Sequence, residues 1–214
     1  MGGYYPVYCD LQGKPCTVVG GGQVAERKVQ SLLECGARVT VVSPTLDTPR
    51  LREWCQQDLL ALLPRSYRPG DVAGAFLVIS ATDQAEVNAL VARDCRARGI
   101  IVNVVDAPEL CDFIVPSVVR RGDLVISIST GGKSPLLARL LREELEERYG
   151  PEYGILADML GEARRQLQSG VDEQVERREI LLRILNAGLL DLIKSGNIPR
   201  AKERMQECIS SPLG

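Results

Sequence analysis

The run from Gly20 to Ala25 is the part of this 214-residue sequence with the clearest chemical use. It has the pattern Gly-x-Gly-x-x-Ala, and it lies between an apolar, β-branched run ending at Val19 and a stretch with helical spacing of apolar residues. Glycines let backbone N–H groups approach a pyrophosphate closely, and a helix N-terminus adds about half a positive charge. A tight turn without a ligand is the alternative, but the flanking pattern favours a dinucleotide-binding turn.

The ribose end of such a site has an unusual sequence here. The position about twenty residues after the turn, where an acid usually binds the adenosine ribose, holds Ser43, Pro44 and Thr45. The hydroxyl groups of Ser43 and Thr45 can still bind the ribose. No arginine cluster adjoins them, which favours NAD over NADP, although nearby Arg50 keeps that preference weak. We expect the cofactor to contact Gly20, Gly22, Gln23, Val24, Ser43, Pro44, Thr45, Thr82 and Asn103.

Asp106 is the best-placed candidate for proton transfer. The sequence has no histidine, so a general base must be Asp, Glu, Lys, Tyr or Cys. Asp106 follows the strand predicted at 100–105, at the sheet edge where doubly wound folds bind ligands. It could equally cap the turn before Pro108, and position alone leaves both interpretations open. Asp83 follows another predicted strand, but a helix N-cap role together with Glu86 explains it without catalysis.

A second glycine-rich loop runs from Thr130 to Pro135 into a helix, where it could bind an anion. It lacks the full P-loop spacing, and helix capping by Ser134 accounts for most of it. A local excess of basic residues would suit a substrate with several carboxylates, although a solvated helix face explains Arg139 and Arg142 equally well. The residues expected to contact the substrate are Arg120, Thr130, Gly131, Lys133 and Ser134.

Alternating strands and helices must position these residues. Apolar runs predict buried strands at 16–19, 38–43, 76–80 and 100–105, with helices between them. This alternation predicts an α/β fold with a Rossmann-type, doubly wound parallel sheet. We therefore assign residues 1–112 to a NAD-binding Rossmann domain.

The pattern changes after Pro108. Two apolar runs flank a tight turn at 121–123 and predict a β-hairpin, and the next helix carries a stripe of leucines from Leu136 to Leu145. A lone hairpin and helix bury little surface, so we expect residues 113–149 to form a dimerisation segment that pairs with a second copy in a homodimer. Residues 150–214 show helical periodicity alone, which predicts a small all-helical C-terminal domain.

Composition excludes several classes of function. The formal charge of −2 gives no general positive field for nucleic acid or an anionic membrane. Apolar runs are too short to span a bilayer, and the N-terminus lacks the features of a signal peptide. Seven cysteines without a C-x-x-C pair indicate free thiols, no zinc site and a reducing compartment. We expect a cytoplasmic protein without a resident metal.

Four blocks, in order and spacing, resemble the precorrin-2 dehydrogenase and sirohydrochlorin ferrochelatase family of siroheme synthesis. They are residues 18–28, 80–83, 103–108 and 129–139. The resemblance covers about residues 1 to 150 closely and the helical tail loosely. The 103–108 block and the Gly-Gly-x-Ser-Pro loop are far more specific than the glycine turn.

The resemblance implies oxidation of precorrin-2 to sirohydrochlorin with NAD as hydride acceptor and, in bifunctional members, insertion of ferrous iron to give siroheme. It implies a proton-transfer role for Asp106 and an intertwined homodimer through the hairpin. Since no methyltransferase domain follows, the chain looks like a stand-alone relative of the N-terminal module of siroheme synthase. Thr130 departs from the fused enzymes, which place a phosphorylatable serine there.

Two other functions stay open. One is an NAD(P)-dependent reductase of another small acid with the tail as a lid, which the 103–108 block argues against. The other is a non-enzymatic nucleotide-sensing domain that binds NAD and switches a partner, which needs no catalytic carboxylate. Tight NAD binding without turnover of any tetrapyrrole would identify the sensing domain.

Overall fold

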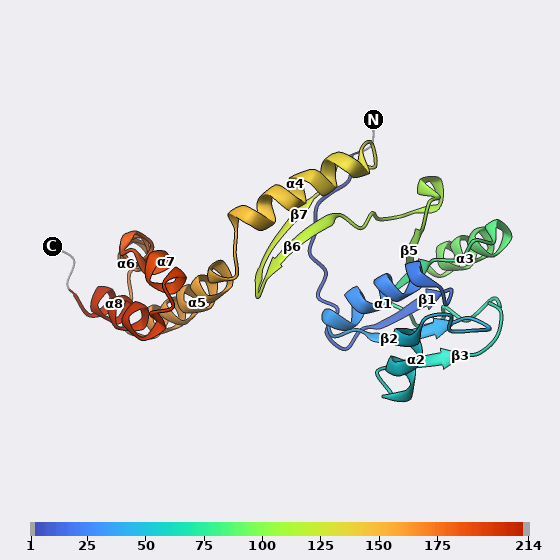
Figure 1. The fold of residues 1–214 in the computed structure, drawn as a ribbon, viewed down its shortest axis with the longest axis horizontal. Helices are drawn as coiled ribbons and strands as arrows, with labels where there is room; N and C mark the ends of the chain where they lie inside the picture. Colours follow the sequence, from blue (N-terminus) through green and yellow to red (C-terminus); the bar gives the residue numbers. More distant parts are fainter. Residues whose placement is uncertain (1–2, 212–214) are drawn as a thin grey trace. The chain divides into compact units, whose positions relative to one another are not determined.

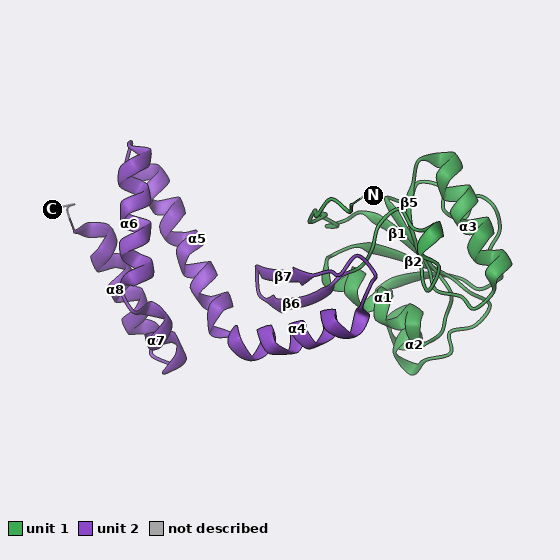
Figure 2. Cartoon of the chain, turned by 90° about the horizontal axis from the view of Figure 1, so that it is seen from above, with its two compact units in different colours: residues 1–115 green, residues 116–214 purple. Residues whose placement is uncertain are grey.

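The computed structural model describes residues 3–211, and these fall into two compact units. The units are Met1–Val115 and Pro116–Gly214, shown in green and purple in Figure 2. The three-part division into residues 1–112, 113–149 and 150–214 stays a prediction.

The first unit is a five-stranded parallel sheet with the strand order β3-β2-β1-β4-β5 (Figure 1). The chain winds outward from β1 to β3 and then returns to β4 on the other side of β1, so β1 and β4 enclose the point where the strand order reverses. The predicted α/β Rossmann-type fold is confirmed. The strands are β1 (Pro15–Val19), β2 (Arg38–Val42), β3 (Leu60–Leu63), β4 (Leu77–Ser80) and β5 (Ile101–Val104); the helices are α1 (Gln23–Glu34), α2 (Pro49–Gln56), α3 (Ala85–Arg98) and the 3-10 turn η1 (Pro108–Leu110).

Both faces of this sheet are buried, which is why its central strands are almost continuously apolar. On one face, Val18 and Ile79 pack in a cluster with Val29 of α1. On the other face, Val78 packs in a cluster with Val91 of α3. The alternation of side chains along each strand therefore assigns α1 and α3 to opposite faces.

The prediction that Asp83 caps the following helix is wrong. Helix α3 begins at Ala85 with Gln84 as its N-cap residue. The reason is a turn that begins at Thr82, whose Oγ1 accepts a hydrogen bond from the N–H of Gln84 at 3.2 Å. Asn88 Nδ2 donates to the carbonyl oxygen of Thr82 at 3.0 Å and so fixes this turn ahead of α3.

The second unit contains an antiparallel hairpin and five helices between residues 116 and 211. The hairpin begins at Ser117, later than the Phe113 start of the predicted apolar run, because Pro116 cannot donate to a ladder. Ser134 caps α4 by accepting from the N–H of Leu137, with Pro135 in the first turn, as predicted. The elements are β6 (Ser117–Arg121), β7 (Leu124–Ile128), α4 (Pro135–Arg148), α5 (Glu152–Gly170), α6 (Gln174–Asn186), α7 (Leu189–Lys194) and α8 (Ile198–Ser210).

A separate apolar core holds the last four helices together. It includes Met159 and Leu167 of α5, Ile184 of α6 and Met205 of α8, all almost fully buried. This confirms the predicted helical tail. Between residues 3 and 211, no helix has the length and apolar character needed to cross a membrane.

Candidate functional site

Three loops meet at the carboxyl edge of the sheet in the first unit. Gly20 has a φ of +121°, and a Cβ built on it would overlap the carbonyl oxygen of Ala81, which follows β4. A Cβ on Gly21 would overlap the carbonyl oxygen of Thr45 and would lie 2.7 Å from Ser43 Oγ, both after β2. These two glycines are therefore required for the loops to pack against one another.

Gly22 differs from its two neighbours because the space beside it is open. Its φ is −89°, and the nearest atom to a Cβ built there is Asp47 Oδ2, at 3.9 Å. Helix α1 starts at this point, and no side chain within residues 3–211 caps its first turn. Within the same range, helices α3, α5, α6 and α7 also lack a side-chain cap, whereas α2, α4 and α8 are capped by Thr48, Ser134 and Asn197. An open backbone surface beside uncapped N–H groups is suited to the pyrophosphate of a dinucleotide, and the contact of these residues with a cofactor stays a prediction.

The loop after β2 brings an acidic residue back to the glycine turn. The N–H of Asp47 donates to the carbonyl oxygen of Gly21 at 2.9 Å. Thr45 Oγ1 donates to Asp47 Oδ1 at 2.8 Å, while Ser43 is buried and Pro44 is exposed. Our sequence-based prediction missed Asp47, although it is the first acidic residue after β2.

Thr82 and Asn103, two further expected cofactor contacts, already have partners inside the fold. Thr82 takes part in the turn before α3 described above. Asn103 is buried on β5, and its Nδ2 donates to the carbonyl oxygen of Phe113 at 2.9 Å. Their contact with a cofactor stays a prediction.

Asp106 lies two residues beyond β5, on an exposed turn with a φ of +60°. Within residues 3–211 its carboxylate makes no hydrogen bond or ion pair, and the residue at the N-cap of the turn that follows is Ala107. The turn-capping interpretation of Asp106 therefore finds no hydrogen bond to support it. The carboxylate is available for chemistry.

Lys28 of α1 interacts electrostatically with Asp106. Burial lowers the pKa of Lys28, and Arg27 lowers it further, while Asp106 and Cys111 act in the opposite direction. Lys28 lies about 9 Å along the helix axis from Gly22, where α1 starts. Asp106 is therefore close enough to Lys28 for the two charges to interact.

The segment after Asp106 fixes the loop by binding the outer edge of β5. Cys111 Sγ accepts from the N–H of Val104 at 3.1 Å and donates to the Val104 carbonyl oxygen at 3.2 Å. Asp112 Oδ2 accepts from the N–H of Val102 at 3.0 Å, and the Asp112 N–H donates to the Val102 carbonyl oxygen at 2.8 Å. These side chains complete the ladder that an edge strand leaves open.

The expected substrate residues belong to the second unit. Thr130 Oγ1 donates to the carbonyl oxygen of Ser134 at 3.1 Å and accepts from its N–H at 3.0 Å. The Gly131 N–H donates to Ser129 Oγ at 3.0 Å. Lys133, like Arg120, is exposed. These hydrogen bonds thus fix the conformation of the loop and cap α4. Substrate contact by these residues stays a prediction.

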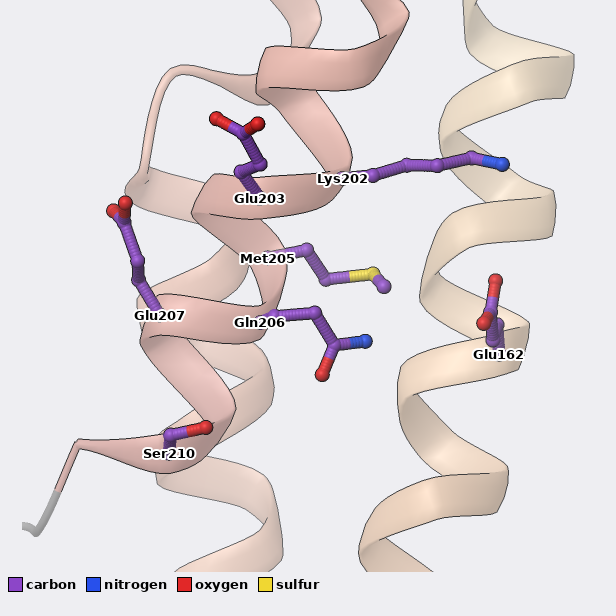
Figure 3. A pocket seen from close by; sticks show the side chains of 7 residues that line it. All are labelled: Glu162, Lys202, Glu203, Met205, Gln206, Glu207 and Ser210. Carbon is purple, nitrogen blue, oxygen red and sulfur yellow. The ribbon is translucent and has the colours of Figure 1, made fainter.

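Two grooves in the structure are lined by residues other than those of the glycine turn. One, of about 710 Å³, lies between α5 and α8 and is lined by three glutamates, Glu162, Glu203 and Glu207, and by Lys202 (Figure 3). Its negative balance does not suit a substrate rich in carboxylates. The other includes Arg38 and Leu60 at the amino ends of β2 and β3, the opposite edge of the sheet from the turn.

Family models match two consecutive parts of the chain. Residues 7–117 match the family described as "Putative NAD(P)-binding", and residues 121–148 match the one described as "Sirohaem biosynthesis protein central". The first match covers the glycine turn, the loop after β2 and Asp106. The second covers the hairpin turn, the loop at 130–134 and α4.

Curated relatives carry the name siroheme synthase. The chain is 42% identical over 205 residues to that of Methylobacillus flagellatus, which covers 96% of this chain and 44% of the relative. It is 44% identical over 187 residues to siroheme synthase 1 of Aeromonas salmonicida, which covers 87% of this chain and 40% of the relative. The chain thus spans less than half the length of these relatives.

A solved structure described as "SirC, precorrin-2 dehydrogenase" has a similar fold over almost the whole chain. The TM-score is 0.78 at 27% sequence identity, with 97% of this chain and 100% of that chain covered. The resemblance inferred from the four sequence blocks is confirmed.

Proposed function

The chain belongs to the NAD(P)-binding family that its residues 7–117 match, and on that premise we propose that it oxidises precorrin-2 to sirohydrochlorin with NAD as the hydride acceptor. The observation that carries this proposal is the likeness to a precorrin-2 dehydrogenase structure over 97% of the chain. The siroheme synthase relatives support the same substrate class.

The glycine turn would hold the cofactor. The backbone of Gly20 to Gly22 and the uncapped N-terminus of α1 would bind the pyrophosphate, with Gln23 and Val24 in the first turn. Bound NAD supplies a nicotinamide ring that accepts a hydride.

Asp106 would accept the proton. Oxidation of precorrin-2 removes a hydride and a proton, so a base must stand beside the macrocycle while the hydride leaves. Asp106 is exposed and lies at the carboxyl edge of the sheet. Within residues 3–211 its carboxylate makes no hydrogen bond or ion pair that would have to break before it accepts a proton. Arg120, Thr130, Gly131, Lys133 and Ser134 are proposed to contact the substrate, whose carboxylates would favour the two basic side chains.

We further propose a homodimer formed through the hairpin and α4. Leu136 and Leu140 of α4 are 67% and 53% exposed, and Leu137 and Leu141 beside them are also exposed. One face of α4, through Ala138, is covered by the hairpin, so the leucine stripe needs another apolar surface. A second copy of the same segment supplies one.

A cytoplasmic location is part of the same proposal. The cysteines in residues 3–211 form no disulfide bond, and burial raises the pKa of Cys16 to about 11 and that of Cys95 to about 12. Cysteines that keep their thiols in this way fit a reducing compartment.

Anaerobic incubation with precorrin-2 and NAD tests the proposed function. NADH and the absorbance of sirohydrochlorin should appear together, and a parallel reaction should contain NADP. Absence of NADH would overturn the proposal, and NAD binding without turnover would favour a nucleotide-sensing domain. Ferrous iron added to the product then tests chelation, for which Asp106 is the proposed proton acceptor; in residues 3–211 no group of three ligand-type side chains could hold a resident metal.

A further inference from the structure

Asp47 is fixed against the glycine turn by its own backbone. Its N–H donates to the carbonyl oxygen of Gly21 at 2.9 Å, and the loop that carries it packs so closely that a Cβ on Gly21 would overlap Thr45. Asp47 is therefore held beside the cofactor turn by main-chain contacts, independently of its side chain.

The two carboxylate oxygens of Asp47 have different surroundings. Oδ1 accepts a hydrogen bond from Thr45 Oγ1 at 2.8 Å, which fixes the orientation of the group. Oδ2 is the atom nearest to a Cβ built on Gly22, at 3.9 Å, so it faces the open space where α1 begins. Oδ2 is free to accept a hydrogen bond from a ligand in that space.

The two arginines nearest to Asp47 in the sequence, Arg50 and Arg52, interact with other residues. Arg50 lies 5.1 Å from the ring of Trp54 and donates from Nη1 to Gln30 at 3.2 Å. Arg52 donates from Nη1 to the carbonyl oxygen of Leu46 at 2.6 Å. Within the described range 3–211, Asp47 forms no ion pair, so no basic side chain is bound to its carboxylate in the loop after β2.

We propose that Asp47 determines cofactor specificity, by accepting hydrogen bonds from the adenosine ribose hydroxyl groups of NAD and repelling the 2′-phosphate of NADP. The inference rests on the dinucleotide site of the proposed function. An acid after β2 that binds the 2′-hydroxyl is a general device of dinucleotide-binding folds. Here the usual position holds Ser43, Pro44 and Thr45, and Asp47 reaches the site through the return of the loop to Gly21.

Binding of NAD and NADP to the full chain, measured by calorimetry in the absence of substrate, tests the proposal. The wild-type protein should bind NAD more tightly than NADP. Asp47→Asn keeps the shape of the side chain and an oxygen acceptor for Thr45, but removes the charge. It should lower the ratio of the NADP to the NAD dissociation constant by about tenfold or more, mainly by tightening NADP binding.

Asp58→Asn is the matched control. Asp58 is an exposed aspartate between α2 and β3, at the opposite end of the sheet, and asparagine tolerates its φ of +56°. This variant removes the same charge and should leave both dissociation constants unchanged.

The outcomes separate the two proposals. A wild-type protein that binds neither nucleotide would overturn the dinucleotide site and the role of Asp47 together. NAD binding with an unchanged ratio in Asp47→Asn, or an equal change in Asp58→Asn, would overturn the role of Asp47 alone. The expected ratios combined with no oxidation of precorrin-2 would support Asp47 and refute the proposed substrate.

Discussion

At the scale of single residues, the three consecutive glycines of the turn meet different requirements. Gly20 and Gly21 have backbone atoms where a side chain would stand, so they are needed for folding. Gly22 has open space and an ordinary φ, so the folded chain alone would accept a Cβ there. The open position is the one that a pyrophosphate has to approach.

Replacing these glycines should therefore separate stability from binding. Gly22→Ala should leave the free energy of unfolding within about 0.5 kcal/mol of the wild type, but weaken NAD binding by more than about tenfold, or ~1.4 kcal/mol. Gly20→Ala should cost about 3 kcal/mol of stability, because it combines a strained φ with a backbone overlap. Denaturant titration and calorimetry measure the two effects; equal loss of stability in both variants would contradict this distinction.

Asp106→Asn should lower kcat by about 100- to 10,000-fold, the usual range for loss of a general base. The NAD dissociation constant should stay the same, because Asp106 is not part of the glycine turn. Stopped-flow measurement of NADH under anaerobic conditions provides kcat. Asp83→Asn, which removes an exposed carboxylate after β4, is the control and should retain wild-type turnover. Full activity in Asp106→Asn would require another proton acceptor.

The glycine turn and Asp106 could be proposed from the sequence because each is encoded locally, by a motif or by its place after a strand; their roles stay predictions. Asp47 could not be found in this way, because its position depends on a hydrogen bond between two loops. Lys28 was missed for a similar reason: its relation to Asp106 depends on how α1 packs over the sheet.

At the scale of elements, the connection from β3 to β4 crosses the sheet without a helix and depends on two aspartates. Asp94 of α3 accepts from the Tyr67 hydroxyl and from the N–H of Gly70, both at 2.7 Å, and from Arg98. Asp71 accepts two hydrogen bonds from Arg65 at 2.7 Å. Within the described part of the chain, the connection has no backbone hydrogen bonds of a sheet or helix to stabilise it, and the hydrogen bonds to these two carboxylates take over that role.

Stability should fall in acid because of these two groups. Hydrogen bonds from Arg65 lower the pKa of Asp71 below its ordinary 3.8; burial alone would raise the pKa of Asp94, but its hydrogen bonds outweigh burial and lower it. A lowered folded pKa stabilises the protein above 3.8, and this contribution is lost as the pH falls further.

Asp94→Asn should therefore reduce the free energy of unfolding at neutral pH by about 2 kcal/mol. Its melting temperature should also fall less steeply than that of the wild type as the pH drops below about 4. Circular dichroism melts across this range measure both effects, with Asp58→Asn as the control. Parallel curves for Asp94→Asn and the wild type would exclude a contribution from Asp94.

Long, strongly patterned elements were the ones that sequence could predict. The strands β1, β2, β4 and β5 and the helices α1 and α4 have clear apolar periodicity or capping residues. Strand β3, Leu60–Leu63, has no β-branched residue and lies at the sheet edge, so neither propensity nor alternation marked it. Helix α3 begins later than the sequence predicted, because Thr82 starts a turn that sequence spacing alone does not reveal.

At the scale of the whole molecule, the residues with expected functions are distributed over both units. The first carries the nucleotide turn and Asp106, and the second carries the hairpin, the expected substrate residues and the leucine stripe of α4. The stripe marks the second unit as the place where two copies are expected to meet.

Leu140→Glu should convert the proposed dimer into a monomer. A charge in the centre of an apolar interface loses its hydration without gaining a partner, which costs several kcal/mol. Light scattering coupled to gel filtration should show twice the monomer mass for the wild type and the monomer mass for the variant. Arg139→Gln, on α4 but outside the stripe, should stay dimeric. A monomeric wild type at micromolar concentration would refute the dimer.

The outer edge of β5 also affects how the protein behaves in concentrated solution. Bare sheet edges recruit strands from other chains and so start aggregation. Here Cys111 and Asp112 already occupy the N–H and carbonyl groups of Val102 and Val104 that an incoming strand would use. We therefore expect the residues that fix the Asp106 loop also to oppose polymerisation along this side of the sheet.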